Sequence, residues 1–583
     1  NIQKQDVYDV MGKKPNLVIF DRGFFANQWV AAINLDFNTI LYLCSIIIFL
    51  ALLVSYGRLE LTLMAFAPMA ISWVIILGIM AVLGIEFNII NIILSTFIFG
   101  LGDDFSIFMM DGMQQEYRTG KKIVNSHKIA ILFSAFTATV GMGVLIFAKH
   151  PALKSISFIS IIGMLSVLLV SYTIIPILFR SFITNPTKKG NYPYTLVYLT
   201  ITTLTYILFI TGSLLLFIIR ILLIFVSVSS KKKKEIFSRM TMYFMRAFLF
   251  LIFYTNKEII NPTAEKFEKP AIIVANHQSM IDILIMLSLT PKMIMVTNKW
   301  VWNSPVFGHV VRYAGFIPSH KGFENMNEIL REKIADGYSV VIFPEGTRSV
   351  DGKIKRFHKG AFMLAKNLKL DIVPITLYGT GQLLNKRQMY YVKPGTYVAS
   401  ILPRITPDKL NKYVTLNDAA RATANVIRSE YSRLYDRYSR PDNVYLRHKL
   451  TANYVYKGPV EEWYVRIKSA MEDYYKYFES IIPRRASVVD VGCGYGMLSY
   501  MLANTSNERT ILGIDYDEDK TAVANHNFSK TKRIQFECAD ALTYHFPHAD
   551  VFVINDVLHY MDYDSQEILM EKCVSKMNKG GMI

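Results

Sequence analysis

Asn276-His277-Gln278-Ser279-Met280-Ile281-Asp282 lies near the middle of the chain, directly after the strand-like apolar run 271–275. His277 and Asp282 are five positions apart, which on a regular helix would separate their side chains by about 140°. They can meet only if His277 lies in the loop after the strand and Asp282 in the first turn of a helix. In that geometry the carboxylate orients the imidazole, and the other ring nitrogen is left to accept a proton. Since no serine nucleophile accompanies the pair, we predict that the deprotonated group is a hydroxyl of the substrate.

A second polar stretch, Phe343-Pro344-Glu345-Gly346-Thr347-Arg348-Ser349, follows the apolar run 338–343. Its turn suits an anion, because Arg348 offers a fork of donors and a fixed charge. Together the two stretches resemble the glycerolipid acyltransferase family of the lysophosphatidic acid acyltransferase type. The resemblance implies that His277 is the general base and Asp282 its partner, and that the acceptor is bound by Glu345, Gly346, Thr347 and Arg348.

One block departs from the family pattern. Where the family has a glycine-led segment ending in an arginine that contacts the acceptor phosphate, this chain reads Gly315-Phe316-Ile317-Pro318-Ser319-His320-Lys321. Lys321 is the predicted substitute for that arginine. The resemblance implies acyl-acyl carrier protein or acyl-coenzyme A as the donor. The altered block leaves two acceptor classes open, a lysophospholipid or another hydroxylated or aromatic lipid.

The composition points to a membrane protein. Hydrophobic residues make up 52% of the 583 residues, which is high for a soluble chain. The formal net charge is +18, and because its lysine runs lie beside long apolar segments, we expect a membrane surface as partner and no nucleic acid. The four cysteines show no metal-ligand spacing, so we expect no metal site. The sequence begins without methionine and ends in a strand-like run, which suggests that both ends continue.

Apolar segments dominate the first third of the chain and predict a helical transmembrane bundle over residues 37–184, preceded by the tail of an extracytoplasmic domain at 1–36. Basic residues cluster in alternate connections, so the positive-inside rule places the tail outside and the chain after 184 in the cytoplasm. We therefore expect a multi-pass protein of a bacterial inner membrane with cytoplasmic catalytic domains. Five segments are each long enough to cross a bilayer: 38–56, 61–84, 88–112, 129–148 and 156–179.

The third segment contains Phe99-Gly100-Leu101-Gly102-Asp103-Asp104-Phe105. Acidic residues within a span must face protein, a partner or water, which marks them as functional candidates. The motif resembles a signature of the large RND-type lipid exporters, the MMPL family, and the five segments match the last five of that family's twelve. The resemblance implies a proton relay at Asp104, with Asp103 as an additional acid. It also implies a partner, either a missing N-terminal transporter half or a second copy of the chain.

A further apolar stretch, 193–230, is interrupted by Thr211-Gly212-Ser213 and flanked by lysines on both sides. We predict either a helical hairpin that turns near Gly212 or a segment lying in the membrane interface. The amphipathic run 236–254 either holds the catalytic domain against the bilayer or is one of its core helices. The acyltransferase domain is expected over 236–438, closed by a helix at 416–438.

Glycines follow a strand in the stretch Asp490-Val491-Gly492-Cys493-Gly494-Tyr495-Gly496, where they let a backbone approach a ligand at a helix N-terminus. Two further strands end at Asp515 and Asp540. A nicotinamide-binding domain is one reading, but the series resembles class I S-adenosylmethionine-dependent methyltransferases. The resemblance implies that S-adenosylmethionine is bound by Asp490, Gly492, Gly494, Gly496, Asp515 (ribose) and Asp540 (adenine). Asp556 and His559 would lie near the methyl group or have a structural role.

The expected fold class is therefore multidomain: an α-helical transmembrane bundle, an α/β acyltransferase domain and, over 444–583, a partial α/β Rossmann-like methyltransferase domain. We expect a membrane-bound enzyme that acylates a lipid hydroxyl and carries methyl-transfer activity. The alternative is a proton-driven exporter of a lipid or pigment-lipid in which acyl and methyl transfer are accessory activities.

Overall fold

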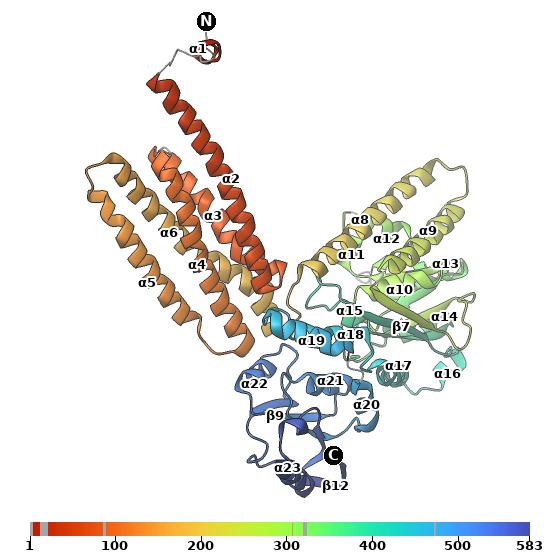
Figure 1. The fold of residues 1–583 in the computed structure, drawn as a ribbon. Helices are drawn as coiled ribbons and strands as arrows, with labels where there is room; N and C mark the ends of the chain where they lie inside the picture. The colour runs from red at the N-terminus through yellow and green to blue at the C-terminus, as the bar shows by residue number, and fades with distance from the viewer. Residues whose placement is uncertain are drawn as a thin grey trace. The chain divides into compact units, whose positions relative to one another are not determined.

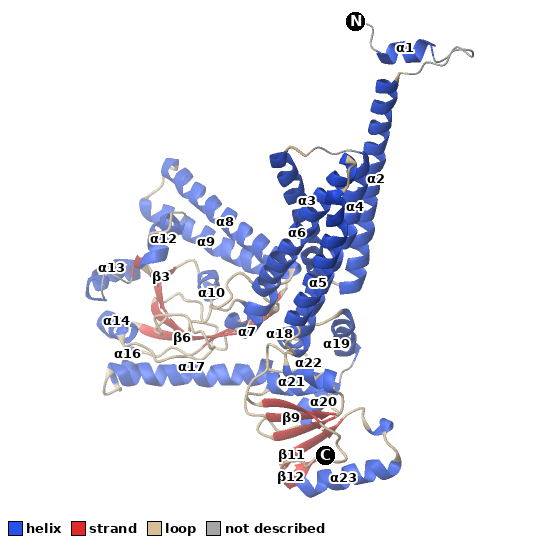
Figure 2. Ribbon diagram, turned by 90° about the vertical axis from the view of Figure 1, so that its left-hand side faces the viewer, coloured by secondary structure: helices blue, strands red, loops and turns tan. Residues whose placement is uncertain are grey.

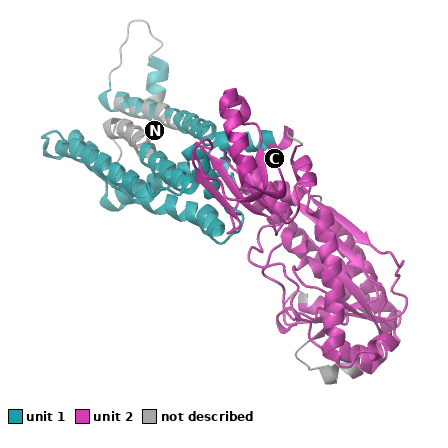
Figure 3. Ribbon diagram, turned by 90° about the horizontal axis from the view of Figure 1, so that it is seen from below, with its two compact units in different colours: residues 1–193, 454–468, 517–528 teal, residues 194–453, 469–516, 529–583 magenta. Residues whose placement is uncertain are grey.

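The computed structural model describes residues 4–11, 21–85, 89–252, 254–305, 307–318, 323–471 and 474–583. The chain forms two compact units (Figure 3). Unit 1 comprises residues 1–193, 454–468 and 517–528, and unit 2 comprises residues 194–453, 469–516 and 529–583.

Unit 1 is helical, and its long helices pack into a bundle (Figure 1). Leu61, Met109, Met164 and Ile175 are among the side chains that form its core. The long helices are α2 (Arg22–Tyr56), α3 (Leu59–Leu83), α4 (Ile89–Thr119), α5 (Val124–Gly143) and α6 (Pro151–Phe179). The shorter pieces are α1 (Lys4–Met11), the 3-10 turn η1 (Val144–Phe147), the π-helical turn η2 (Arg180–Thr184) and α7 (Asn185–Lys188).

The predicted transmembrane segments fall on α2 to α6. Among the described residues, four helical stretches are long and apolar enough to cross a membrane: 59–83, 124–147, 151–188 and 196–225. Helix α2 begins at Arg22, inside the predicted tail 1–36, whose boundary at residue 36 stays a prediction. Asp21 caps this helix, with its Oδ1 accepting hydrogen bonds from the N–H groups of Gly23 (2.8 Å) and Phe24 (3.2 Å). The polar residues 22–36 therefore extend the first helix.

The first sheet of unit 2 has seven strands in the order β1-β7-β6-β2-β5-β3-β4, parallel except for the β6–β7 pair. Its central strand β2 is buried on both faces, as parallel strands covered by helices usually are. The strands are β1 (Thr255–Ile260), β2 (Ala271–Ala275), β3 (Met293–Thr297), β4 (Ile317–Pro318), β5 (Ser339–Ile342), β6 (Asp371–Tyr378) and β7 (Gly395–Ile401).

Helices cover both faces of this sheet (Figure 2). Alternate residues of β2 enter two different cores: Ile273 packs with α9 and α10, and Ile272 packs with α14 and α17. The predicted closing helix at 416–438 is confirmed as α17. The helices are α8 (Leu196–Phe225), α9 (Ser230–Leu251), α10 (Ile281–Leu289), α11 (Lys299–Trp302), α12 (Phe307–Tyr313), α13 (Phe323–Ala335), α14 (Gly360–Leu368), α15 (Thr380–Leu383), α16 (Pro407–Asn411) and α17 (Leu416–Tyr438).

The hairpin predicted near Gly212 is wrong, because α8 runs unbroken from Leu196 to Phe225. Gly212 is the site of a close helix contact: a Cβ atom there would lie 2.0 Å from Cε2 of Phe244 in α9. The second helix of the pair is therefore α9, whose Met245 and Leu249 enter the core of the first sheet. Helices α8 and α9 both pack with this sheet and its helices, and the predicted domain start at residue 236 stays a prediction.

The second sheet of unit 2 is all parallel, with the order β10-β9-β8-β11-β12. The predicted strands that lead to Asp515 and Asp540 are confirmed as β9 and β10. The elements are β8 (Ser487–Val491), β9 (Thr510–Asp515), β10 (Ile534–Cys538), β11 (Ala549–Ile554), β12 (Met577–Met582), α18 (Val444–Ala452), α20 (Tyr474–Ile481), α21 (Met497–Thr505), the 3-10 turn η4 (Leu558–Tyr560) and α23 (Tyr563–Lys576). Helix α22 (Glu518–Asn525) and most of α19 (Pro459–Met471) belong to unit 1.

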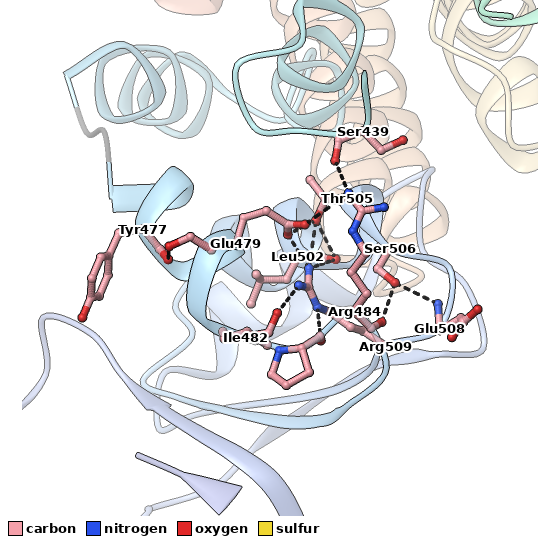
Figure 4. Close-up of polar contacts among 12 residues, drawn as sticks. Ser439, Tyr477, Glu479, Ile482, Arg484, Leu502, Thr505, Ser506, Glu508 and Arg509 are labelled. Atoms are coloured by element: carbon pink, nitrogen blue, oxygen red, sulfur yellow. Dashed lines mark hydrogen bonds and ion pairs between the residues drawn. The ribbon is translucent and has the colours of Figure 1, made fainter. Parts of the chain in front are cut away.

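A fully buried arginine joins the chain that enters this sheet to the end of α21 (Figure 4). Arg509 donates to Oε2 of Glu479 (2.5 Å), to the carbonyl oxygens of Pro483 (3.0 Å), Ile482 (2.6 Å) and Leu502 (3.1 Å), and to Oγ1 of Thr505 (3.0 Å). The neighbouring Arg484 donates to Asp436 and to the carbonyl oxygen of Ser439, at the end of α17. Every hydrogen-bonding nitrogen of Arg509 thus has an acceptor, as a buried charge requires.

Candidate active sites

His277 and Asp282 meet as the sequence predicts. His277 lies in the loop after β2, and Asp282 lies in the first turn of α10, with 2.8 Å between Nδ1 of His277 and Oδ2 of Asp282. Asp282 is completely buried, and the same Oδ2 accepts hydrogen bonds from the N–H groups of Gln278 (2.6 Å) and Ser279 (2.8 Å). The imidazole stacks on Phe343, with 4.1 Å between ring centroids. The pair therefore has a fixed ring, and Nε2 is available as the proton acceptor.

Glu345 follows strand β5 and supports the loop that contains His277. Its Oε1 accepts from the N–H of His277 (2.8 Å), and its Oε2 accepts from the N–H of Lys355 (2.9 Å). The residue is buried, and burial raises the pKa of its carboxyl group. Both oxygens are thus engaged with backbone, so the structure assigns Glu345 to holding His277. The contact with an acceptor that the resemblance implies stays a prediction.

Asn276 is a supporting residue that sequence reasoning missed. It is fully buried and exchanges two hydrogen bonds of 2.8 Å with the backbone of Leu377 in β6. These bonds attach the catalytic loop to the neighbouring strand at the point where β2 ends. In the sequence, the position of this polar residue directly after the apolar run 271–275 could have indicated its supporting role.

The remaining acceptor-binding candidates are less closely grouped. Gly346 lies beside the cavity at His277, in a left-handed turn with φ of 69°. The guanidinium of Arg348 lies instead against the sulfur of Met389, with 3.6 Å from NH2 to Sδ. A further basic residue beside this turn is Lys386, which the sequence analysis did not identify. Its Nζ donates a hydrogen bond to Oγ1 of Thr347 (3.1 Å). Lys321 lies outside the described residues.

A cavity of about 1080 Å³ begins at His277 and extends beneath α8 and α9. Cavities for drug-sized ligands are usually roughly 300–1,000 Å³, so this one accommodates a long ligand. Its polar end includes His277, Gly346, Arg356 and His358. The rest is mainly apolar, with Phe209, Leu216, Met245, Phe248, Leu284 and Leu287 among the residues that line it.

The second candidate site lies at the carboxyl ends of β8, β9 and β11. Gly492, Gly494 and Gly496 all have positive φ, and a Cβ atom at Gly494 would meet nothing within 4 Å. Oδ2 of Asp515 accepts from the N–H of Gly494 (2.7 Å), which ties the loop to the end of β9. This open glycine cradle with a carboxylate beside it fits the adenosine part of S-adenosylmethionine.

Asp490 and Asp540 do not contact the backbone of the glycine loop in the way that Asp515 does. Asp490 is buried below the loop, where its Oδ2 accepts from the hydroxyl of Ser499 (2.6 Å), and burial raises its pKa to about 6. It therefore shapes the loop from below. Asp540 is exposed at the end of β10, and its Oδ1 accepts from the N–H of Leu542 (2.9 Å).

Asp556 and His559 form a pair at the end of β11. Nδ1 of His559 is 3.6 Å from Oδ1 of Asp556, and both side chains are more than half exposed. Asp556 has φ of 61°, an uncommon conformation for a residue other than glycine. Val557 packs against Gly492 of the cofactor loop, so the pair is adjacent to that loop.

The acidic candidates of the membrane bundle are only partly described. Asp104 is exposed on α4, and the next two residues, Phe105 and Ser106, are buried in the bundle. The side chain of Asp103 lies outside the described residues.

Three family models match the chain. A model named Acyltransferase matches residues 251–378, one named Methyltransferase domain matches 488–581, and one named MMPL family matches 25–183. The chain therefore contains three regions that each match a different family model. The region matched by the Acyltransferase model contains His277 and Asp282, the region matched by the Methyltransferase domain model contains the glycine loop, and the region matched by the MMPL model contains Asp104.

Curated relatives match the acyltransferase domain. The 1-acyl-sn-glycerol-3-phosphate acyltransferase of Chlamydomonas reinhardtii is 34% identical over 161 residues, which cover 26% of this chain and 47% of the relative. The chloroplastic LPAT1 of Arabidopsis thaliana is 36% identical over 122 residues, covering 20% and 34%. The Helicobacter pylori 1-acyl-sn-glycerol-3-phosphate acyltransferase is 32% identical over 143 residues, covering 24% and 60%. The chain thus spans less than two thirds of each of these relatives.

Solved structures match two regions. PlsC, the 1-acyl-sn-glycerophosphate acyltransferase of Thermotoga maritima, aligns over 41% of this chain and 94% of its own, with 21% identity and a TM-score of 0.34. CalO1, a methyltransferase in calicheamicin biosynthesis in its SAH-bound form, aligns over 23% and 47%, with 17% identity and a TM-score of 0.18.

Proposed function

We propose that the chain transfers a fatty acyl group from acyl-acyl carrier protein or acyl-coenzyme A to a hydroxyl of a lysophospholipid or related lipid. The observation that carries this proposal is the oriented His277–Asp282 pair, whose imidazole lines a large and mainly apolar cavity. The names of the relatives support the acceptor class, and the fixed positive charge of Arg356, which lines the cavity, suits an anionic headgroup.

The geometry supports a direct transfer. Nε2 of His277 takes the proton of the acceptor hydroxyl as its oxygen attacks the thioester carbonyl. Asp282, already bonded to Nδ1, stabilises the imidazolium that forms. The imidazolium then gives the proton to the departing thiolate, so that the histidine returns to its initial state. The apolar cavity holds an acyl chain away from water throughout.

The methyltransferase domain acts in this proposal on the same amphiphilic product or its precursor. S-adenosylmethionine supplies an electrophilic methyl group when bound. The backbone of Gly492 to Gly496 would approach its adenosine part, Asp515 would bind the ribose hydroxyls, and Asp540 would contact the adenine edge.

We further propose that the MMPL region places both enzymes at a bacterial inner membrane, with the catalytic domains on the cytoplasmic side. The placement rests on apolar helices and on the distribution of basic residues. Asp104, exposed on α4, would face either a missing transporter half or a second copy of the chain.

The test is mass spectrometry of lipids from membranes that contain the full-length protein, comparing wild type with His277→Ala. The expected result is loss of a diacylated phospholipid and accumulation of its one-chain precursor. Loss of a different ester-linked lipid, with phospholipids unchanged, would move the acceptor to a specialised lipid. Unchanged acylation of every lipid would overturn the proposal.

The exposed carboxylate of Asp104 also favours a second function, proton-driven export of the lipid product. Asp104→Asn would then reduce the amount of that lipid outside the cell while acylation in the membrane continues. If Asp104→Asn left export unchanged, the relay assignment would be wrong.

A further inference from the structure

One end of the helical bundle in unit 1 contacts two stretches that come from much later in the chain. These are segment 454–468 and helix α22, which lies within the region matched by the methyltransferase family model. The bundle side consists of the α2–α3 connection and the end of α4, and both stretches belong to unit 1.

Two ion pairs hold segment 454–468. Nε of Arg58 donates to Oε1 (2.9 Å) and Oε2 (2.7 Å) of Glu462, and the two side chains are only 12% and 7% exposed. NH1 of Arg118, in the last turn of α4, donates to Oε1 of Glu461 (2.6 Å), whose side chain is 7% exposed. Arg58 and both carboxylates are thus largely removed from water, and Arg118, with 29% of its side chain exposed, is partly removed, unlike ordinary surface ion pairs.

Apolar packing continues the same contact. Val455 and Tyr456 belong to the core of the bundle, and the guanidinium of Arg58 lies 5.3 Å from the ring centroid of Tyr456. Gln114 of α4 donates to the carbonyl oxygen of Tyr456 (3.2 Å). A Cβ atom at Gly57 would lie 2.9 Å from Cβ of Pro459, so the two backbones approach closely.

Lys457 links the segment to α22. It is buried, and its Nζ donates to the carbonyl oxygen of Val523 in α22 (2.9 Å) and lies 6.0 Å from the ring centroid of Tyr117 in α4. Burial lowers the pKa of this ammonium group. At the end of α22, His526 occupies the space beside Gly120, where an added Cβ would lie 1.8 Å from its Cε1.

We propose that this end of the bundle is a specific docking surface whose occupant is segment 454–468 together with α22. In sequence, Arg58 and Arg118 indicate only which side of a membrane a loop occupies. In the structure their charges are matched by adjacent acidic residues, Glu461 and Glu462, and the neighbouring contacts exclude water. The MMPL region is thereby joined to part of the methyltransferase region by a built interface in addition to the peptide chain. The competing possibility is that the two arginines serve anionic lipid headgroups, and that the segment leaves them in a bilayer.

Exchanging the charges of one ion pair in the full-length protein distinguishes the docking of segment 454–468 from lipid binding by the arginines. Arg118→Glu, Glu461→Arg and the double variant are compared with wild type in lipid nanodiscs that contain anionic lipid. The Arg58–Glu462 pair is less suitable, because Arg466 also contacts Glu462 and would repel a new arginine. The readout is hydrogen–deuterium exchange of the backbone amides in 455–466 and 519–525.

In each single variant, we expect the backbone amides of both stretches to exchange with deuterium at least about tenfold faster than in wild type. In the double variant, the rates should return to near the wild-type values. Lys121 and Glu518 provide a matched control, because they form an exposed pair, with 51% and 71% of the side chains accessible. Exchanging their charges should change the rates less than about twofold.

Unchanged exchange in both single variants would overturn the proposal, as would a double variant that exchanges as fast as the single ones. If the single variants fail to fold, recovery of folding by the double variant supports the interface, and failure to recover counts against it. The same samples are also assayed for acyl transfer. This activity reports the folding of the acyltransferase region alone, which contains none of the substituted residues.

Discussion

Gly212 of α8 lies directly against the ring of Phe244 in α9, so close that a Cβ atom at position 212 would be 2.0 Å from Cε2 and 2.3 Å from Cζ of the ring. Phe244 in turn packs with Phe209 and Phe248, which line the apolar cavity. The glycine therefore sets the distance between the two helices that enclose the predicted acyl chain site.

Replacing this glycine with alanine should destabilise the helix pair. In an unconstrained helix, Gly→Ala stabilises by about 1 kcal/mol, but here the ring of Phe244 must move and the gain is lost. Gly141→Ala in α5 is the matched control, because nothing lies within 4 Å of its added Cβ. Thermal melting should show a lower transition for Gly212→Ala and an unchanged or higher one for Gly141→Ala. Equal stabilisation by both substitutions would contradict the helix contact.

Asp282→Asn should keep the fold and reduce acyl transfer by a factor on the order of 10⁴. The asparagine oxygen can still accept from the N–H groups of Gln278 and Ser279, but a neutral amide no longer stabilises the imidazolium of His277. The measurement is transfer from radiolabelled acyl-coenzyme A to lysophosphatidic acid, with the melting temperature as control. Activity near the wild-type value would show that the charge of Asp282 does not assist His277.

Glu345→Gln separates a supporting role from an acceptor-binding role. The carboxylate accepts hydrogen bonds from the backbone N–H groups of His277 and Lys355. The single carbonyl oxygen of a glutamine side chain can replace only one of these two acceptors. Misplacement of the catalytic loop should lower kcat by roughly 10- to 100-fold while the KM for the acceptor stays constant. A raised KM with unchanged kcat would instead support the direct contact that the family resemblance implies.

Arg509→Met should destabilise the methyltransferase domain by about 3–5 kcal/mol, because it removes the buried cation that pairs with Glu479 and that donates to three interior carbonyl oxygens. Arg533→Met is a comparison of similar size at a partly exposed arginine. Calorimetry of the full chain should show a lower methyltransferase transition for Arg509→Met and a much smaller change for Arg533→Met. The acyltransferase transition should remain in place for both.

Asp490 predicts a pH dependence of stability. Its pKa is raised by burial to about 6 in the folded chain, from 3.8 when exposed. Between these values the folded state holds a proton that the unfolded state has lost, so this group's stabilising contribution decreases as pH rises from about 4 to 6. The stability of Asp490→Asn relative to wild type should therefore increase over that interval, by roughly 1–3 kcal/mol, and stay constant above it. Calorimetry at several pH values tests this, and a constant difference would contradict it.

The sequence predicted the elements that depend on local pattern and spacing. The interval between His277 and Asp282 required a loop and a helical first turn, and β2 and α10 provide both. The glycine loop, its flanking strands and helix α17 were also predicted, because apolar periodicity and turn residues specify them.

What the sequence did not show depends on contacts between distant residues. Gly212 was wrongly predicted as a turn because glycine often breaks helices, whereas its role depends on Phe244. The motif at Glu345 predicted an acceptor contact, which stays a prediction, but did not show that this carboxylate accepts from two backbone N–H groups. The polar composition of 22–36 did not show that α2 already begins at Arg22.

The outer surface of α8 has a kinetic consequence. Val197, Leu204, Ile207, Leu215 and Leu222 are all more than half exposed, while other residues of the same helix line the cavity. If this surface lies in a bilayer, the acceptor reaches His277 by lateral diffusion and does not cross bulk water. Turnover would then follow the mole fraction of acceptor in the membrane, and adding inert lipid would slow the enzyme at constant total substrate.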